Sequence, residues 1–160
     1  MHGKYFSFGA TSAVLTSLAV IVGLSGSANP TVSIITALAI IAIADNVSDS
    51  FGIHVHQEAQ KESVKEVRRT TIANFATRVL VVSIFILFVI FLPMKFAVVS
   101  SIFFGLAVIS FISYFIAKEQ ESAAQKMVLR HLLLAVLVIG ASFLLRELIS
   151  GLIAKFGSDP

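Results

Sequence analysis

The chain carries no charged side chain between Lys4 and Asp45. An interval of this length accommodates two apolar helices of about 20 residues each, the length that crosses the hydrocarbon core of a bilayer. Gly26 and Pro30 interrupt the interval, and proline is favoured in the first turn of a helix. The interval therefore predicts two membrane-spanning helices, over residues 8–27 and 31–58.

Three further runs lack Asp, Glu, Lys and Arg altogether, at residues 79–94, 96–117 and 131–145. Together with flanking residues, each run is long enough to supply another apolar span. We therefore expect three more helices, over residues 75–94, 96–117 and 128–150.

The composition agrees with a membrane protein. Apolar residues make up 57% of the 160 residues and charged residues 13%, whereas about 25% of the residues of a soluble domain are charged. The sequence thus predicts an all-α, multi-pass integral membrane protein, with five transmembrane helices in a single domain over residues 1–160. We expect the second helix to extend into the cytosol, with a short cytosolic helical segment at about residues 56–72. The location would be the cell membrane of a prokaryote, or the vacuolar or another internal membrane of a eukaryote.

The basic residues orient the helices. With a cytosolic N-terminus, nine of the 12 Lys and Arg residues fall on the cytosolic side and three on the outer side, a positive-inside bias. The net charge of +3 then follows from membrane topology, and no nucleic-acid partner is expected. The inner set is Lys4, Lys61, Lys65, Arg68, Arg69, Arg78, Lys118, Lys126 and Arg130, and the outer set is Lys95, Arg146 and Lys155.

Two aspartates lie inside the second predicted helix, four positions apart. From the rise of about 1.5 Å per residue, Asp45 lies roughly 21 Å and Asp49 roughly 27 Å from the outer end of the helix, in a hydrocarbon core about 30 Å thick. Gly52 and His56 continue the same helical face. Because an aspartate that faces lipid is costly, this face should point into the bundle or toward a hydrated pathway.

This polar face suits cation chemistry. Carboxylates are hard oxygen ligands for divalent cations, and imidazole binds transition metals. Asp45, Asp49 and His56, with His54 nearby, therefore predict successive weak sites for a metal cation, and carboxylates can also exchange protons. Alternatively, the aspartates only hydrogen-bond to hydroxyls of the first helix. The hydroxyls expected along the pathway are those of Ser12, Thr16 and Ser48.

The segment ADNVSDSFG, residues 44–52, resembles the second-helix signature of the vacuolar iron transporter family, A-D-G-x-S-M-G-x-G-E-Y. The end of the first helix, VGLSGS at residues 22–27, resembles that family's closing G-L-S-G-A, and residues 130–145 resemble its fifth helix. The resemblance implies five helices with the N-terminus inside, a homodimer, and proton-coupled export of Fe²⁺ or Mn²⁺ from the cytosol. The matching positions of the signature are Ala44, Asp45, Ser48 and Gly52.

The chain also departs from the family pattern, and three of the departures bear on the expected pathway. Ser12 occupies the place of an aspartate early in the first helix, Asp49 replaces a methionine of the pathway, and Ile53 replaces the glutamate of G-E-Y. Exchange of a soft thioether for a carboxylate favours harder ions such as Mn²⁺ or Fe²⁺. If the protein belongs to the family that it resembles, the departures predict a divergent member of that family with a changed substrate.

Glu58, Glu62 and Glu66 recur at intervals of four residues in the polar segment after the second span. One interpretation is a solvated helix whose charges pair with neighbouring lysines. The other rests on the resemblance, because vacuolar iron transporters carry a glutamate-rich, metal-collecting region in this loop. In that interpretation His54 and Glu58 are the best candidate ligands.

The residues and the resemblance together predict a secondary transporter that exports Fe²⁺ or Mn²⁺, with protons moving in the opposite direction. The metal ion is its substrate, and no permanently bound cofactor is expected. The alternative is a non-transporting membrane protein that retains the fold, such as a metal sensor or a partner subunit. The sequence contains no Walker loop, nucleophile elbow or HExxH motif, so no enzymatic activity is expected.

Overall fold

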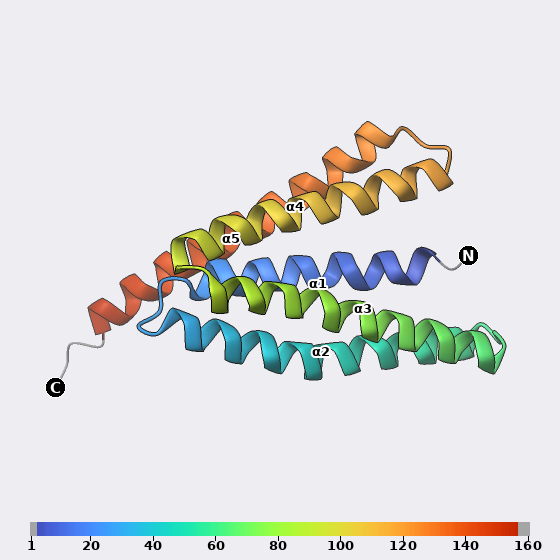
Figure 1. Ribbon diagram of the computed structural model, residues 1–160, viewed down its shortest axis with the longest axis horizontal. Helices are drawn as coiled ribbons and strands as arrows, with labels where there is room; N and C mark the ends of the chain where they lie inside the picture. The colour runs from blue at the N-terminus through green and yellow to red at the C-terminus, as the bar shows by residue number, and fades with distance from the viewer. Residues whose placement is uncertain (1–2, 157–160) are drawn as a thin grey trace.

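The computed structural model describes residues 3–156, with side chains described over residues 9–155, and consists of five α-helices (Figure 1). The predicted all-α class with five helices is confirmed, and the described residues contain no strand. Residues 1–2 and 157–160 of the predicted domain lie outside the described part. The helices are α1 (Gly3–Leu24), α2 (Pro30–Ala59), α3 (Val64–Phe91), α4 (Met94–Glu119) and α5 (Ala124–Phe156).

Four of the helices, α2 to α5, are long and apolar enough to cross a membrane. The corresponding apolar part of α1, Gly9–Leu24, is shorter than these four helices. The N-terminus lies at one end of the bundle with the α2–α3 and α4–α5 turns, and the C-terminus lies at the opposite end (Figure 1). These long apolar helices indicate a membrane-embedded protein.

The polar segment between the second and third spans is divided between the end of α2 and the start of α3. Helix α3 begins at Val64, well before residue 75, because a capping box starts it there. The Ser63 hydroxyl accepts a hydrogen bond from the backbone N–H of Glu66 at 3.3 Å, and Glu66 stands three positions later, as the capping box requires. The polar segment is therefore helical on both sides of a short turn over residues 60–63.

The two turns at the N-terminal end of the bundle have the same geometry. Lys61 and Glu121 adopt left-handed backbone angles, with φ of 57° and 51°. The next N–H group closes each turn: Glu62 donates to the Gln57 carbonyl at 3.2 Å, and Ser122 donates to the Ala117 carbonyl at 3.0 Å. These are Schellman-type helix ends, and they fold α2–α3 and α4–α5 into two antiparallel hairpins.

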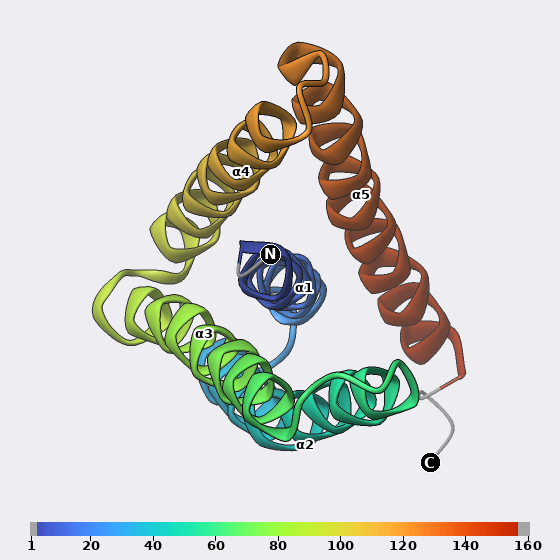
Figure 2. The same ribbon diagram turned by 90° about the vertical axis from the view of Figure 1, so that its right-hand side faces the viewer.

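Helix α1 lies in the centre of the bundle and packs against all four other helices (Figure 2). Its apolar residues recur every three or four positions and bury one broad face. Gly105 of α4 permits close packing there, because a Cβ at this position would lie 2.8 Å from Leu18 Cδ1. The buried residues of α1 in the core are Ala10, Ala13, Val14, Leu18 and Ile21.

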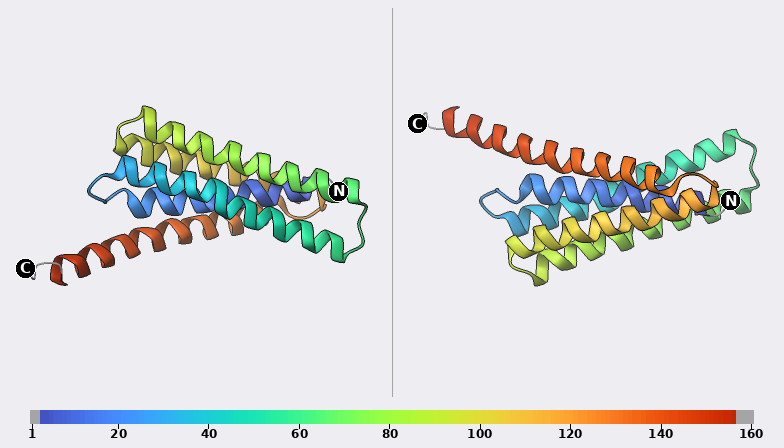
Figure 3. Two further views of the ribbon diagram at one scale, coloured as in Figure 1. Left: turned by 90° about the horizontal axis from the view of Figure 1, so that it is seen from below. Right: turned by 90° about the horizontal axis from the view of Figure 1, so that it is seen from above.

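Helix α5 diverges from the other helices toward its C-terminal end (Figure 3). Only Ala135 is buried in the described part of this helix, whereas most of its large apolar side chains are exposed. Arg146 ties the far end of α5 to α1, since its Nη1 donates to Ser25 Oγ at 3.0 Å. Arg146 also pairs with Glu147, as expected for neighbouring opposite charges. An apolar outer surface of this kind suits contact with lipid.

Candidate functional site

The two aspartates of α2 share one arginine of α3. Arg78 Nη2 lies 2.5 Å from Asp45 Oδ2, and Arg78 Nη1 lies 2.5 Å from Asp49 Oδ2. The Arg78 side chain is only 2% exposed, whereas the side chains of Asp45 and Asp49 are 42% and 32% exposed. The arginine therefore approaches from the protein interior, and the carboxylates stand between it and the exposed flank of α2. We call these three residues the charge cluster.

The register of the α2–α3 hairpin brings the cluster together. Gln60 and Ser63 are the two ends of the turn between α2 and α3. Asp45 lies as many residues before this turn as Arg78 lies after it, so the antiparallel helices place Asp45 and Arg78 at the same level. Asp49 lies one helical turn from Asp45 on the same side of α2. The planar guanidinium presents its donors as a rigid fork, which allows one arginine to bond to both carboxylates.

Buried polar side chains continue along the α2–α3 interface from the cluster toward the turn. Asn46 Nδ2 donates to the Phe75 carbonyl at 3.1 Å, and Asn74 Nδ2 donates to Ser50 Oγ at 3.3 Å. Nearer the turn, Thr70 Oγ1 donates to Gln57 Oε1 at 2.5 Å. Side-chain hydrogen bonds of this kind hold helices together in an apolar environment, where the alternative is an unsatisfied polar group.

Two amide oxygens of this interface have no hydrogen-bond partner among the described residues, Asn46 Oδ1 and Asn74 Oδ1. Both asparagines are buried, at 1% and 0% exposure. The Asn74 oxygen lies against α1, since a Cβ built on Gly9 would be 2.3 Å from it and 3.3 Å from Arg78 Cγ. The unfilled Asn74 acceptor therefore stands beside Arg78 in a region that α1 closes, and the unfilled Asn46 acceptor lies in the same α2–α3 interface.

The charge cluster is not electrically neutral. Two carboxylates face one guanidinium, and no other basic side chain in the described part of the chain bonds to Asp45 or Asp49. Each aspartate uses Oδ2 for Arg78, and its Oδ1 has no hydrogen bond from any side chain that the structure describes. The cluster can therefore attract a cation from the exposed flank of α2, and a cation bound there would compete with Arg78 for the carboxylates.

The other predicted ligands do not join the cluster. His54 lies on the opposite side of α2 from Asp45 and pairs with Glu58 at 3.3 Å. His56 shares the face of Asp45 but lies three turns farther along the helix, where its Nε2 contacts Gln60 Nε2 at 3.0 Å. Within the described residues, no group of three or more His, Cys, Asp or Glu side chains could hold a metal ion.

The predicted hydroxyls are also separate from the aspartates. Ser12 and Thr16 of α1 are half-buried, and neither hydrogen-bonds to Asp45 or Asp49 among the described residues. The interpretation in which hydroxyls of the first helix satisfy the aspartates is thus wrong, because Arg78 of α3 takes that role. Ser48 is exposed on the flank of α2.

The three glutamates of the polar segment lie on different elements. Glu58 is near the end of α2, Glu62 lies in the turn, and Glu66 is in the first turn of α3. The Glu62 carboxylate accepts a hydrogen bond from Gln57 Nε2 at 3.1 Å. The regular spacing of four does not form one stripe on a single helix, since the turn at residues 60–63 interrupts it.

Sequence reasoning missed Arg78 as a site residue, because it counted this arginine among the charges at the inner membrane boundary. One signal could have found it. Thr70, Asn74 and Arg78 recur every four positions, which places three polar residues on one face of α3. A short turn between two helices then makes Asp45 and Arg78 neighbours by register.

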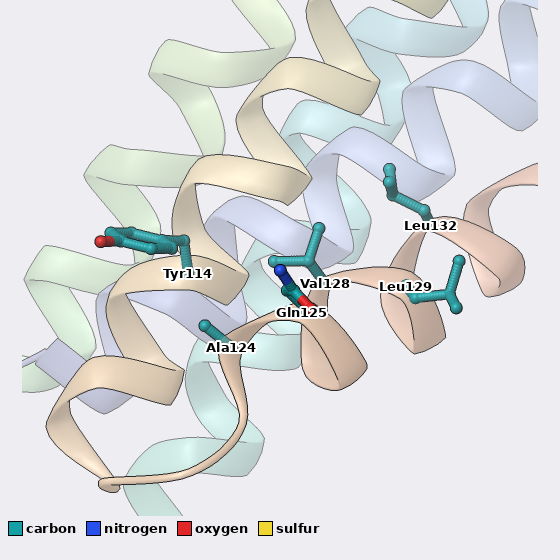
Figure 4. Close-up of a pocket in the computed structure, with 6 residues that line it drawn as sticks. All are labelled: Tyr114, Ala124, Gln125, Val128, Leu129 and Leu132. Carbon is teal, nitrogen blue, oxygen red and sulfur yellow. The ribbon is translucent and has the colours of Figure 1, made fainter.

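The α4–α5 hairpin has a different character. Ser113 Oγ lies 2.7 Å from His131 Nδ1, which links the two helices. A pocket of about 330 Å³ lies on this hairpin, and its wall is almost entirely apolar (Figure 4). Apart from the phenol of Tyr114, it therefore offers no group for acid–base or metal chemistry among its lining residues, which are Tyr114, Ala124, Gln125, Val128, Leu129 and Leu132.

The fold and the site define a class of protein: an all-α, membrane-embedded protein in which a buried arginine joins two carboxylates inside an apolar hairpin. Comparison with protein-family models, curated proteins and solved structures found no match for the chain.

Proposed function

We propose that the protein is a secondary transporter that exports a divalent transition-metal cation, Fe²⁺ or Mn²⁺, from the cytosol in exchange for protons. The observation that carries the proposal is the excess carboxylate of the charge cluster, where Asp45 and Asp49 share only Arg78. Ionisable groups inside a membrane protein mark ion and proton pathways more often than structural contacts. The resemblance of residues 44–52 to vacuolar iron transporters supports the same function.

The proposed topology has five membrane crossings, with a cytosolic N-terminus and an external C-terminus. The excess of basic residues on the proposed cytosolic side supports it. The positions of the two termini at opposite ends of the bundle are compatible with it (Figure 1). In this orientation, the exposed flank of α2 beside the aspartates lies within or near the hydrocarbon core.

We propose that the active form is a homodimer packed through this flank. A carboxylate exposed to lipid costs about 2.5–3.5 kcal/mol or more at mid-membrane, so partly exposed aspartates favour cover by a second copy or by water. Small exposed residues border the aspartates at intervals of four, the spacing that permits close helix packing in membranes. These residues are Ala44, Ser48 and Gly52.

Uptake of Mn²⁺ and Fe²⁺ into proteoliposomes, with and without a pH gradient, tests the transport function. Asp45→Asn keeps the shape of the side chain and removes its charge, so we expect it to abolish uptake. Asp49→Asn should reduce uptake less, because Asp49 lies nearer to the cytosolic end. Glu147→Gln, a carboxylate change far from the cluster, is the matched control. Equal uptake by wild type and Asp45→Asn would refute the role of Asp45.

A second candidate function is a non-transporting membrane protein, such as a metal sensor or a partner subunit. The bonding of both carboxylates to Arg78 favours it, because this arrangement can also act as a structural clamp between α2 and α3. In that case no divalent ion would enter proteoliposomes, and Asp45→Asn would lower stability without any transport to lose.

A further inference from the structure

Arg78 and an incoming cation approach the same carboxylates from opposite sides. The arginine comes from the buried side, where it is 2% exposed, and bonds to Oδ2 of each aspartate. The carboxylates themselves are about one-third exposed or more on the flank of α2. A cation that reaches them from this flank is repelled by the guanidinium behind them.

The surroundings of Arg78 contain a second set of acceptors. Asn74 lies one helical turn before Arg78 on α3, and its Oδ1 is buried without a partner among the described residues. Both side chains border the same space beside Gly9, since a Cβ there would approach Asn74 Oδ1 and Arg78 Cγ. Asn46 Oδ1 is buried in the same interface and is likewise unfilled. Buried polar atoms without partners are rare and call for an explanation.

We propose that Arg78 is a built-in counter-ion, which holds Asp45 and Asp49 while no cation is bound and moves to the amide oxygen of Asn74 when a cation takes the carboxylates. This inference rests on the proposed transport function and assigns Arg78 and Asn74 as residues that set cation affinity. Arg78 would offset one of the two carboxylate charges while no metal is bound, so that the metal-free carrier can return with protons and without two uncompensated carboxylates in the membrane.

The proposal predicts opposite effects for two substitutions in the same cluster. Arg78→Gln removes the competing charge and should raise Mn²⁺ affinity by about tenfold or more, because a unit charge at contact distance is worth more than one tenfold step. Asn74→Leu removes the acceptor to which Arg78 moves, so Mn²⁺ affinity should fall by about threefold to tenfold. Thr77→Val, a buried polar change on the same helix outside the cluster, is the matched control and should leave affinity unchanged.

The probe is Mn²⁺ itself, added to the purified full chain in detergent, with binding followed by loss of the electron paramagnetic resonance signal of the free ion. Uptake in proteoliposomes is measured in two modes, net uptake and Mn²⁺/Mn²⁺ exchange. Arg78→Gln should keep exchange and lose most net uptake, since only net uptake requires the metal-free carrier to return with protons. A clamp role for Arg78 would instead lower both modes together.

Removal of a buried arginine can also prevent folding. The test can therefore be made with Arg78→Lys and Asn74→Leu alone if Arg78→Gln does not fold. Lysine keeps the charge of Arg78 but lacks the fork that bonds to both carboxylates. We expect Arg78→Lys to bind Mn²⁺ more tightly than wild type.

Wild-type uptake tests the transport function, whereas the order of affinities tests the counter-ion role, so the two can fail separately. If wild type transports Mn²⁺ while Arg78→Lys and Arg78→Gln bind it no more tightly, or Asn74→Leu binds it no more weakly, the counter-ion role is refuted and the transport function stands. If neither wild type nor any variant binds or transports Mn²⁺, both proposals fall.

Discussion

Gly9→Ala tests the packing of α1 against the α2–α3 interface. A Cβ at Gly9 would lie 2.3 Å from Asn74 Oδ1, 3.2 Å from Asn74 Cγ and 3.3 Å from Arg78 Cγ. The first distance is far below van der Waals contact, so Asn74 must turn or α1 must shift. Asn74 is fully buried and donates to Ser50 Oγ, and a turn of its amide would break that hydrogen bond.

The expected loss of stability follows from three contributions. Overpacking of a well-filled core costs about 1–3 kcal/mol, and the loss of a buried hydrogen bond costs about 1 kcal/mol. Alanine has a higher helix propensity than glycine, which offsets about 1 kcal/mol of this loss of stability. We therefore expect Gly9→Ala to destabilise the protein by about 1–3 kcal/mol.

Unfolding in mixed micelles of mild detergent and dodecyl sulfate, followed by circular dichroism, measures this difference. Gly23→Ala is the matched control on the same helix, because a Cβ there meets nothing within 4 Å. It should be neutral or slightly stabilising. The double variant Gly9→Ala/Asn74→Ala should recover part of the loss, since it removes the atom that the new methyl group meets. Equal midpoints for Gly9→Ala and Gly23→Ala would refute this account of α1 packing.

Three further predictions concern the surface and the topology. Replacement of all three glutamates of the polar segment (Glu58, Glu62 and Glu66) by glutamine should weaken Mn²⁺ binding in detergent if they collect metal, and an unchanged affinity would make them a solvated surface. A reporter fused to the C-terminus should be active only on the non-cytosolic side, and cytosolic activity would overturn the proposed topology. Since the chain has no cysteine, Ser48→Cys provides a single thiol beside the aspartates, which should form a cross-linked dimer in membranes, whereas Leu137→Cys on exposed α5 should not. Exclusively monomeric Ser48→Cys would count against the proposed dimer face.

The helices could be predicted from the sequence because long charge-free runs need no knowledge of tertiary contacts. Pro30, for example, begins α2 as proline in a first helical turn predicts. The start of α3 does not follow from such a charge-free run. Residues 64–74 are mostly polar and lie largely within the segment expected to be a cytosolic helix, yet Val67, Thr70 and Asn74 are buried. Their burial depends on pairing with Gln57 and Ser50, which lie on another helix.

The candidate site could be predicted only in part for the same reason. Asp45 and Asp49 stand out as charges in an apolar helix, and the structure places them on one side of α2. Their partner follows only when the polar spacing on α3 is combined with the position of the α2–α3 turn, since Arg78 lies 33 residues from Asp45 along the chain. The unfilled oxygen of Asn74 depends on the junction of α3 with α1 at Gly9, which no periodicity of a single helix contains.

The central position of α1 has a consequence for the synthesis of the protein. This helix is made first, yet its contact with α5, such as the hydrogen bond from Arg146 to Ser25, joins residues 121 positions apart. At a synthesis rate of about 5–20 residues per second, roughly 6–24 seconds pass between the synthesis of Ser25 and that of Arg146. During this interval the surface that α1 will present to α5 has no final neighbour, and it must be covered by lipid, by the translocation machinery or by an early α1–α3 contact. Ribosome-stalled chains that end before α5 would therefore hold α1 in an incompletely packed state, accessible to chaperones that recognise unassembled membrane helices.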